Sequence, residues 1–207
     1  MTDFFESVYE TARLAVEKSE PAKVYSVSFQ AQNLQHNRRG KVGQFDPQAH
    51  ALLAQNLSGQ WLGGMINLPI HGTALGPENL FYSSDVPGAM EKETELLLKS
   101  EVNNPVILFM NGAEGDVAPI RGGVEGIAQI GQSFSQQLQA AMPSMRELSF
   151  DWDVQYTRFK LGKAALSIKT CTQGSLKDWI PSWLNLNVSA LFPRRVPIAM
   201  IRWDGLS

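Results

Sequence analysis

The chain has 207 residues, of which 43% are hydrophobic and 18% are charged, and this composition is typical of a folded globular protein. Its 18 Lys and Arg are scattered and are balanced by 20 Asp and Glu, giving a net charge of −2, which argues against a nucleic-acid partner. Cys171 is the only cysteine, so the sequence excludes a disulfide within the chain and a Cys-x-x-Cys zinc or redox motif.

The first half of the chain contains patterns for one helix and three strands. Apolar residues at helical spacing predict an amphipathic helix over residues 3–18. Alternating or continuous apolar residues predict strands over residues 24–30, 49–54 and 61–70. We expect a polar loop at residues 32–40 and a turn at residues 56–59 between the second and third of these strands.

The second half predicts a helix over residues 88–100, a short strand over residues 105–110 and a second helix over residues 124–142. The apolar run at 105–110 is nearly uninterrupted, as in a central strand.

The last third of the chain predicts two further strands. Residues 151–160 alternate in the manner of an exposed edge strand. Residues 196–203 predict a strand that leads into Asp204-Gly205, a strong hairpin signal whose second strand does not follow within the chain. Residues 170–193 have no clear period and stay unassigned. No internal repeat or linker marks a boundary, so we expect a single partial domain over residues 1–207.

His71 is the first candidate for chemistry, because it lies where an apolar strand ends and a glycine-containing loop begins. The other interpretation is a partly buried structural histidine. His36 and His50 are the only other histidines, and neither has the spacing of a local zinc motif. Any metal at His71 therefore needs ligands from elsewhere in the protein.

The second candidate is the loop at residues 111–119, which follows the apolar run. Its two glycines let the backbone approach a ligand closely, and successive free amides could stabilise an oxyanion. The same residues are also consistent with a tight turn, and Asp116 could either cap backbone amides or take part in the chemistry. The loop lacks the Gly-Lys-Ser/Thr of a phosphate-binding loop, which argues against nucleotide binding.

Three of these segments together resemble the neutral ceramidase family of zinc-dependent amidases, which cleave the acyl-amide bond of ceramide. The first is Asn37-Arg38, which resembles an Asn-Arg element of the family. The second is residues 71–75 (His-Gly-Thr-Ala-Leu), followed by Asn79, Ser84, Asp85 and Gly88. The third is residues 115–119 (Gly-Asp-Val-Ala-Pro), which is similar to the family's Gly-Asp-Val-Ser-Pro.

The resemblance implies a role for four residues. His71 matches one of the family's zinc-binding histidines, and Arg38 matches an arginine that helps to hold the substrate. Asp116 is a further catalytic candidate within the third motif. Ala118 occupies the position of the family's serine and has no hydroxyl to position, donate or use as a nucleophile. Ile120 replaces the asparagine that often follows the motif's proline.

The resemblance also implies that other zinc ligands lie outside this chain. The family's second zinc histidine belongs to a segment before the predicted helix at 3–18, and its glutamate and tyrosine ligands come after Asp204-Gly205. We therefore expect an α/β fold with a mixed sheet and flanking helices, which forms the incomplete middle portion of a larger catalytic domain. Because catalytic zinc normally takes three protein ligands, we expect the isolated chain to be inactive.

The parent protein is then expected to hydrolyse lipid-like amides of the ceramide class, in sphingolipid metabolism, with zinc as the cofactor. The family suggests a secreted, periplasmic or membrane-associated protein, although the first residues carry no export signal. Exposed sheet edges would allow self-association. The alternatives are a non-catalytic remnant that binds or scaffolds, and an unrelated domain in which His71 is structural.

Overall fold

The computed structural model describes residues 2–40, 45–149, 152–160, 162–163, 165–171, 176–188, 190 and 195–203. Its contacts divide the chain into two compact units, Met1–Leu148 and Ser149–Ser207. Each unit is described by itself.

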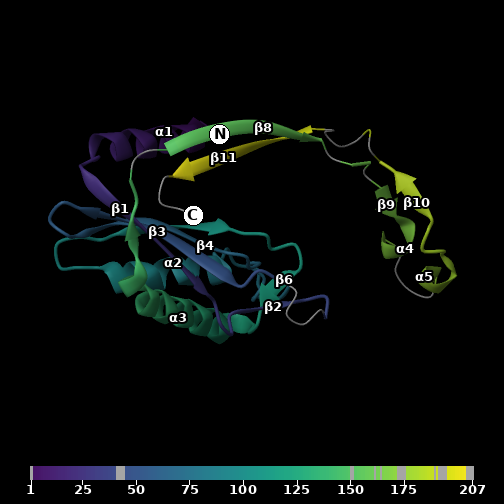
Figure 1. The fold of residues 1–207 in the computed structure, drawn as a ribbon. Coiled ribbons are helices and arrows are strands. Elements are labelled where there is room, and N and C mark those ends of the chain that lie inside the picture. Colours follow the sequence, from purple (N-terminus) through teal and green to yellow (C-terminus); the bar gives the residue numbers. More distant parts are fainter. Residues whose placement is uncertain are drawn as a thin grey trace. The chain divides into compact units, whose positions relative to one another are not determined.

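The described residues of the first unit form both helices and strands (Figure 1). The helices are α1 (Thr2–Glu17), α2 (Asp85–Leu98), α3 (Gly123–Ala141) and the 3-10 helix η1 (Met142–Ser144). The strands are β1 (Ala22–Gln30), β2 (Gln35–Asn37), β3 (Gln48–Asn56), β4 (Trp61–Leu68), β5 (Val106–Asn111), β6 (Val117–Pro119) and β7 (Arg146–Glu147).

A mixed five-stranded sheet, in the order β5-β4-β3-β1-β7, organises the first unit. Its neighbours are antiparallel except for β4 and β5, which are parallel. A parallel pair needs a crossover connection, and α2 supplies it between β4 and β5. Strands β2 and β6 form a separate small antiparallel pair. The prediction of an α/β fold with a mixed sheet and flanking helices is confirmed.

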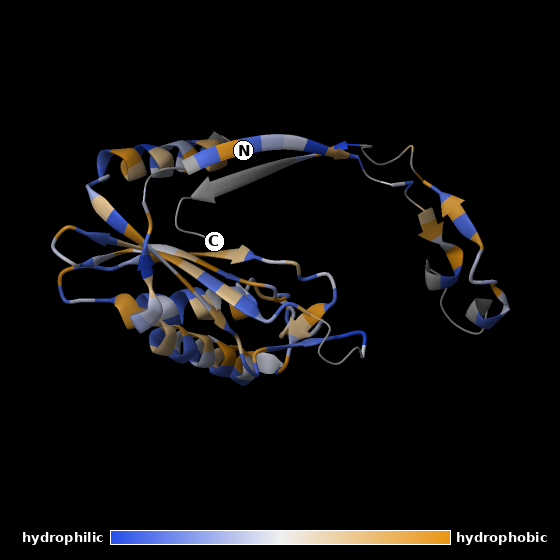
Figure 2. Cartoon of the chain, in the orientation of Figure 1, coloured by the Kyte–Doolittle hydropathy of each residue, from blue (hydrophilic) through white to orange (hydrophobic). Residues whose placement is uncertain are grey.

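The core lies between one face of the sheet and helices α2 and α3, which pack on each other below that face in Figure 1. Leu53 and Ile66 from the strands, Met90 from α2 and Phe134 from α3 are all fully buried. The Phe134 ring contacts Phe29 of β1, with ring centroids 5.6 Å apart. Figure 2 shows apolar and polar residues side by side along α3, as expected for a helix with one buried face.

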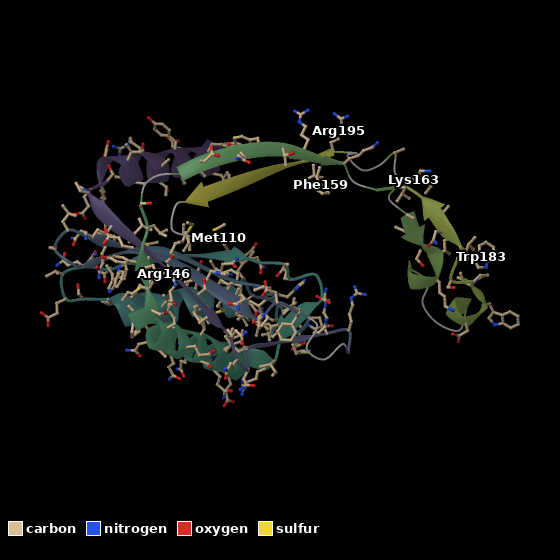
Figure 3. The ribbon with its side chains drawn as sticks, viewed as in Figure 1. Met110, Arg146, Phe159, Lys163, Trp183 and Arg195 are labelled. Carbon is tan, nitrogen blue, oxygen red and sulfur yellow. The ribbon has the colours of Figure 1, made fainter. Side chains whose placement is uncertain are left out.

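Strand β5 differs from its prediction as a central strand, because it lies at an edge of the described sheet. Only alternate side chains of its first half are buried. Val106 and Leu108 are exposed, and Met110, labelled in Figure 3, is also exposed. The backbone N–H groups of Ile107 and Phe109 donate to the carboxylates of glutamates on α2, at 3.0 and 2.7 Å. The edge of β5 is thus covered by glutamate side chains of the crossover helix rather than by another strand.

The second unit contains two strand pairs and two short helices. Strands β8 (Trp152–Lys160) and β11 (Arg195–Trp203) pair antiparallel over nine residues each, and β9 (Ala165–Ser167) pairs with β10 (Asn185–Asn187). Helices α4 (Ile168–Cys171) and α5 (Leu176–Trp179) are four residues long. This unit exposes apolar side chains, including Phe159 of β8 and Trp183 in the turn before β10, which are labelled in Figure 3.

The strands predicted at both ends of this unit are confirmed within the described residues, and their mutual pairing was not foreseen. The Asp204-Gly205 turn lies outside the described residues. Residues 170–193 had no predicted structure. Their described part consists mostly of short helices, a short strand and turns. Among the described helices, none is long and apolar enough to cross a membrane.

Replacing Phe134, a fully buried residue of α3, tests the core. We expect Phe134→Ala to lower the free energy of unfolding by about 3–5 kcal/mol, because it removes a buried ring and leaves a cavity. Phe81→Ala is the matched control, since Phe81 is 84% exposed. Urea denaturation followed by circular dichroism measures both variants. Equal effects of the two substitutions would contradict the core described here.

Candidate functional site

The short β2–β6 pair brings two of the sequence motifs together (Figure 1). In its register His36 lies opposite Ala118 and Asn37 lies opposite Val117. The Asn37-Arg38 element therefore lies beside the motif at residues 115–119, although about eighty residues separate them in the chain. Periodicity did not reveal this pairing, because strands of three residues are too short to show a period.

His71, in the loop after β4, also contacts β6. Its backbone N–H donates to the Val117 carbonyl at 3.3 Å, and its Nδ1 lies 2.9 Å from the same oxygen. The ring is half-buried. The three segments that were singled out in the sequence thus meet at β6, which pairs with β2 and whose Val117 carbonyl bonds His71.

The contact of His71 with Val117 sets the form of its neutral ring. A carbonyl oxygen can only accept a hydrogen bond, so Nδ1 must carry the proton that it donates. Nε2 is then left with a lone pair, which is the form of imidazole that binds a metal ion. A carboxylate oxygen of Glu114 also lies 3.6 Å from Nδ1. Sequence reasoning did not single out Glu114 or the Val117 carbonyl, and neither had a signal apart from its position in the loop.

Asp116 ties the two motifs together through its side chain and its backbone. Its carboxylate accepts a hydrogen bond of 2.7 Å from the Asn37 side-chain amide. Its carbonyl accepts one of 2.8 Å from the Arg38 backbone N–H. The Arg38 guanidinium donates to the Gly115 carbonyl at 3.0 Å, and the side chain is otherwise exposed. The cation of Arg38 therefore lies over the loop of the third motif and faces solvent.

Ala118 and Ile120 complete the segment. Ala118 is half-buried in β6, and its methyl group can neither hydrogen-bond nor act as a nucleophile. Ile120 donates its backbone N–H to the Leu34 carbonyl at 3.0 Å, and its side chain is 42% exposed. The position that would carry a serine in the resembled motif thus holds an inert side chain beside the His71 contact.

The described residues do not form a complete metal site around His71. They contain no group of three His, Cys, Asp or Glu side chains close enough to share a metal ion. Catalytic zinc normally takes three protein ligands and an open position. The described residues therefore do not by themselves fit zinc.

Comparisons with known proteins support the fold. No protein-family model matches the chain, and no curated protein matches it. Among solved structures, it is similar to the neutral ceramidase from Pseudomonas aeruginosa, with a TM-score of 0.69 and 15% sequence identity, covering 94% of this chain and 40% of that one. It is also similar to a ceramidase complexed with C2, with a TM-score of 0.58 and 18% identity, covering 68% of this chain and 25% of that one.

At these identities the likeness shows the fold. The resemblance to neutral ceramidase seen in the sequence is therefore confirmed at that level, and the chain has the fold of part of a ceramidase chain. It spans about 40% of the length of the first of these ceramidases.

The tautomer of His71 is directly measurable. We expect the neutral ring to carry its proton on Nδ1, because that nitrogen faces the Val117 carbonyl at 2.9 Å. Nitrogen-15 NMR of the histidine ring distinguishes the two tautomers. A ring protonated mainly on Nε2 would contradict the contact and would remove the free lone pair from the site.

The Asn37–Asp116 hydrogen bond is tested by a double-mutant cycle. The bond joins a part-buried amide to a carboxylate, so we expect the two alanine substitutions to be coupled by about 1.5 kcal/mol in the free energy of unfolding. The exposed Lys23–Glu147 ion pair is the control and should show a smaller coupling. Strictly additive effects at Asn37 and Asp116 would show that the two side chains do not interact.

Proposed function

We propose that the chain is part of a zinc-dependent amide hydrolase of the neutral ceramidase type. One observation carries the proposal. In a chain with the fold of part of a ceramidase, His71 and Arg38 both contact backbone carbonyls of the motif at residues 115–119, His71 at Val117 and Arg38 at Gly115 and Asp116.

Each residue of the cluster then has a role. His71 would be one zinc ligand through Nε2, held by its Nδ1 contact, and the remaining ligands would lie outside the described residues. Arg38 would hold a polar group of the substrate with its exposed guanidinium. Asp116 orients the Asn37-Arg38 element through its two hydrogen bonds and could also act on the substrate. A bound zinc ion would supply Lewis acidity and an activated water.

The likeness to ceramidases also supports a proposal for the substrate class. We propose a lipid-like amide of the ceramide class, which is hydrolysed to an amine and a fatty acid. Both compact units would belong to one catalytic domain of the parent protein. The isolated chain is expected to be inactive, because its described residues do not form a group of three metal-binding side chains.

A second candidate is a non-catalytic remnant that keeps the fold for binding or scaffolding. Ala118 favours it, because the methyl group offers no nucleophile at the serine position. Metal-dependent amide hydrolysis does not require a serine nucleophile, so Ala118 does not decide between the two candidates. Hydrolysis of a fluorogenic N-acyl substrate by the full-length protein, abolished by a chelator, would refute the remnant.

The first experiment is to sequence the transcript on both sides of this reading frame. An in-frame upstream His-x-His-Ser-Gly segment and a downstream Gly-Glu segment would supply the expected ligands and support the hydrolase. Stop codons close to both ends, or flanks without these segments, would contradict the hydrolase proposal and favour the non-catalytic remnant.

His71→Ala tests the metal role in the full-length protein. We expect the affinity for zinc to fall at least about 10–100-fold, since substitution of even an outer partner of a zinc ligand costs that much. His50→Ala is the control, because the His50 imidazole is exposed and bonds the Ser28 hydroxyl on the sheet. Zinc content by mass spectrometry and amide hydrolysis are the readouts. Undiminished zinc and activity in His71→Ala would overturn the assignment.

A further inference from the structure

We propose that Asp85 is a positioning residue that sets the loop carrying His71. Its carboxylate accepts hydrogen bonds from the backbone N–H groups of Ala74 and Leu75, both at 3.0 Å. It also accepts one of 2.7 Å from the N–H of Val86, in the first turn of α2. One buried side chain therefore ties the loop after β4 to the start of the crossover helix. We call these three hydrogen bonds the clamp.

The burial of Asp85 makes these bonds strong. The residue is only 8% exposed, and a buried carboxylate is stable only when its oxygens are satisfied. Three backbone donors satisfy them here, and the start of a helix also favours negative charge. A carboxylate that accepts several N–H bonds is a better clamp than a neutral acceptor, because bonds to an ionised group are roughly twice as strong as neutral ones.

The backbone of Asp85 is also in an uncommon conformation. Its φ is +50°, in the left-handed region, which disfavours most residues other than glycine. Aspartate and asparagine tolerate this region better than other side chains do. The Ser83 hydroxyl accepts the Asp85 N–H at 3.0 Å, which helps to hold this turn. Retaining such a conformation at the clamp is consistent with a role in positioning.

The loop between His71 and Ala74 is short and is anchored at both ends. His71 is tied to β6 at its backbone and its ring, and Ala74 is tied to Asp85 on one side and to the Gly123 N–H on the other, at 2.8 Å. Only Gly72 and Thr73 lie between these two anchors. The short span leaves little freedom, so releasing the second anchor changes the direction from which the His71 ring approaches Val117.

This inference rests on the proposed function, because the orientation of the His71 ring matters most if Nε2 binds a metal. The clamp itself is independent of zinc and is measured on the chain without metal.

Asp85→Asn in the 207-residue chain tests the clamp. Asparagine has nearly the same shape and tolerates the same φ, so the substitution leaves the turn intact. It replaces one acceptor oxygen by an NH₂ group, which opposes a backbone donor of the loop. Ser83→Ala is the matched control, because it loosens the Asp85 turn without removing a carboxylate oxygen.

Two readouts separate positioning from general stability. Hydrogen exchange at the Ala74 and Leu75 amides should be at least about tenfold faster in Asp85→Asn, the equivalent of one lost hydrogen bond to an ionised group. Nitrogen-15 NMR of His71 should move from the Nδ1-protonated signature toward a mixture of tautomers. Ser83→Ala should leave the His71 signature unchanged. An unchanged exchange rate and signature in Asp85→Asn, or equal effects in both variants, would overturn the proposal.

The unsubstituted chain provides a second test in case Asp85→Asn does not fold. Through-hydrogen-bond couplings between the Asp85 carboxylate carbon and the amide nitrogens of Ala74 and Leu75 should be detectable, and their absence would overturn the clamp. If these couplings are present but His71→Ala keeps its zinc in the full-length protein, the proposed function fails and the clamp stands.

Discussion

The parallel pairing of β4 with β5 is the constraint on which the candidate site depends. The carboxyl ends of neighbouring parallel strands lie at the same edge of a sheet, and loops at that edge commonly carry functional groups. His71 follows the end of β4, and Glu114 follows the end of β5. The direction of the two strands therefore places both loops at the same edge of the sheet, whatever side chains they carry.

The crossover that makes this pairing possible also fixes the first loop. A parallel connection needs a long crossover, and α2 fills it. Its first residue is Asp85, whose carboxylate holds the loop after β4, and Glu91 and Glu95 further along accept N–H groups from β5. One helix thus covers the sheet, satisfies the edge of β5 and anchors the loop of His71. The position of the site follows from these polar contacts as much as from the apolar core.

The sequence predicted the strongly periodic elements of the first unit and each motif of the candidate site separately. Helices α1, α2 and α3 and strands β1, β3 and β4 were predicted to within a few residues, because each presents a repeating apolar pattern. The described contacts bury part of that pattern in all of them except α1, whose apolar side chains are exposed. The pairing of β2 with β6 was missed because three residues carry no detectable period. The edge position of β5 was missed because an apolar run says nothing about which of its sides a neighbour covers.

The contacts that hold the candidate site are made largely by backbone atoms, so its geometry depends little on which side chains the loop carries. The carbonyls of Gly115, Asp116 and Val117 accept bonds from Arg38 and His71, and none of these bonds depends on the side chain at position 118. The side chain at position 118 can therefore change without moving His71 or Arg38, because their framework is set by strand pairing and by the hydrogen bonds of the Asp85 carboxylate.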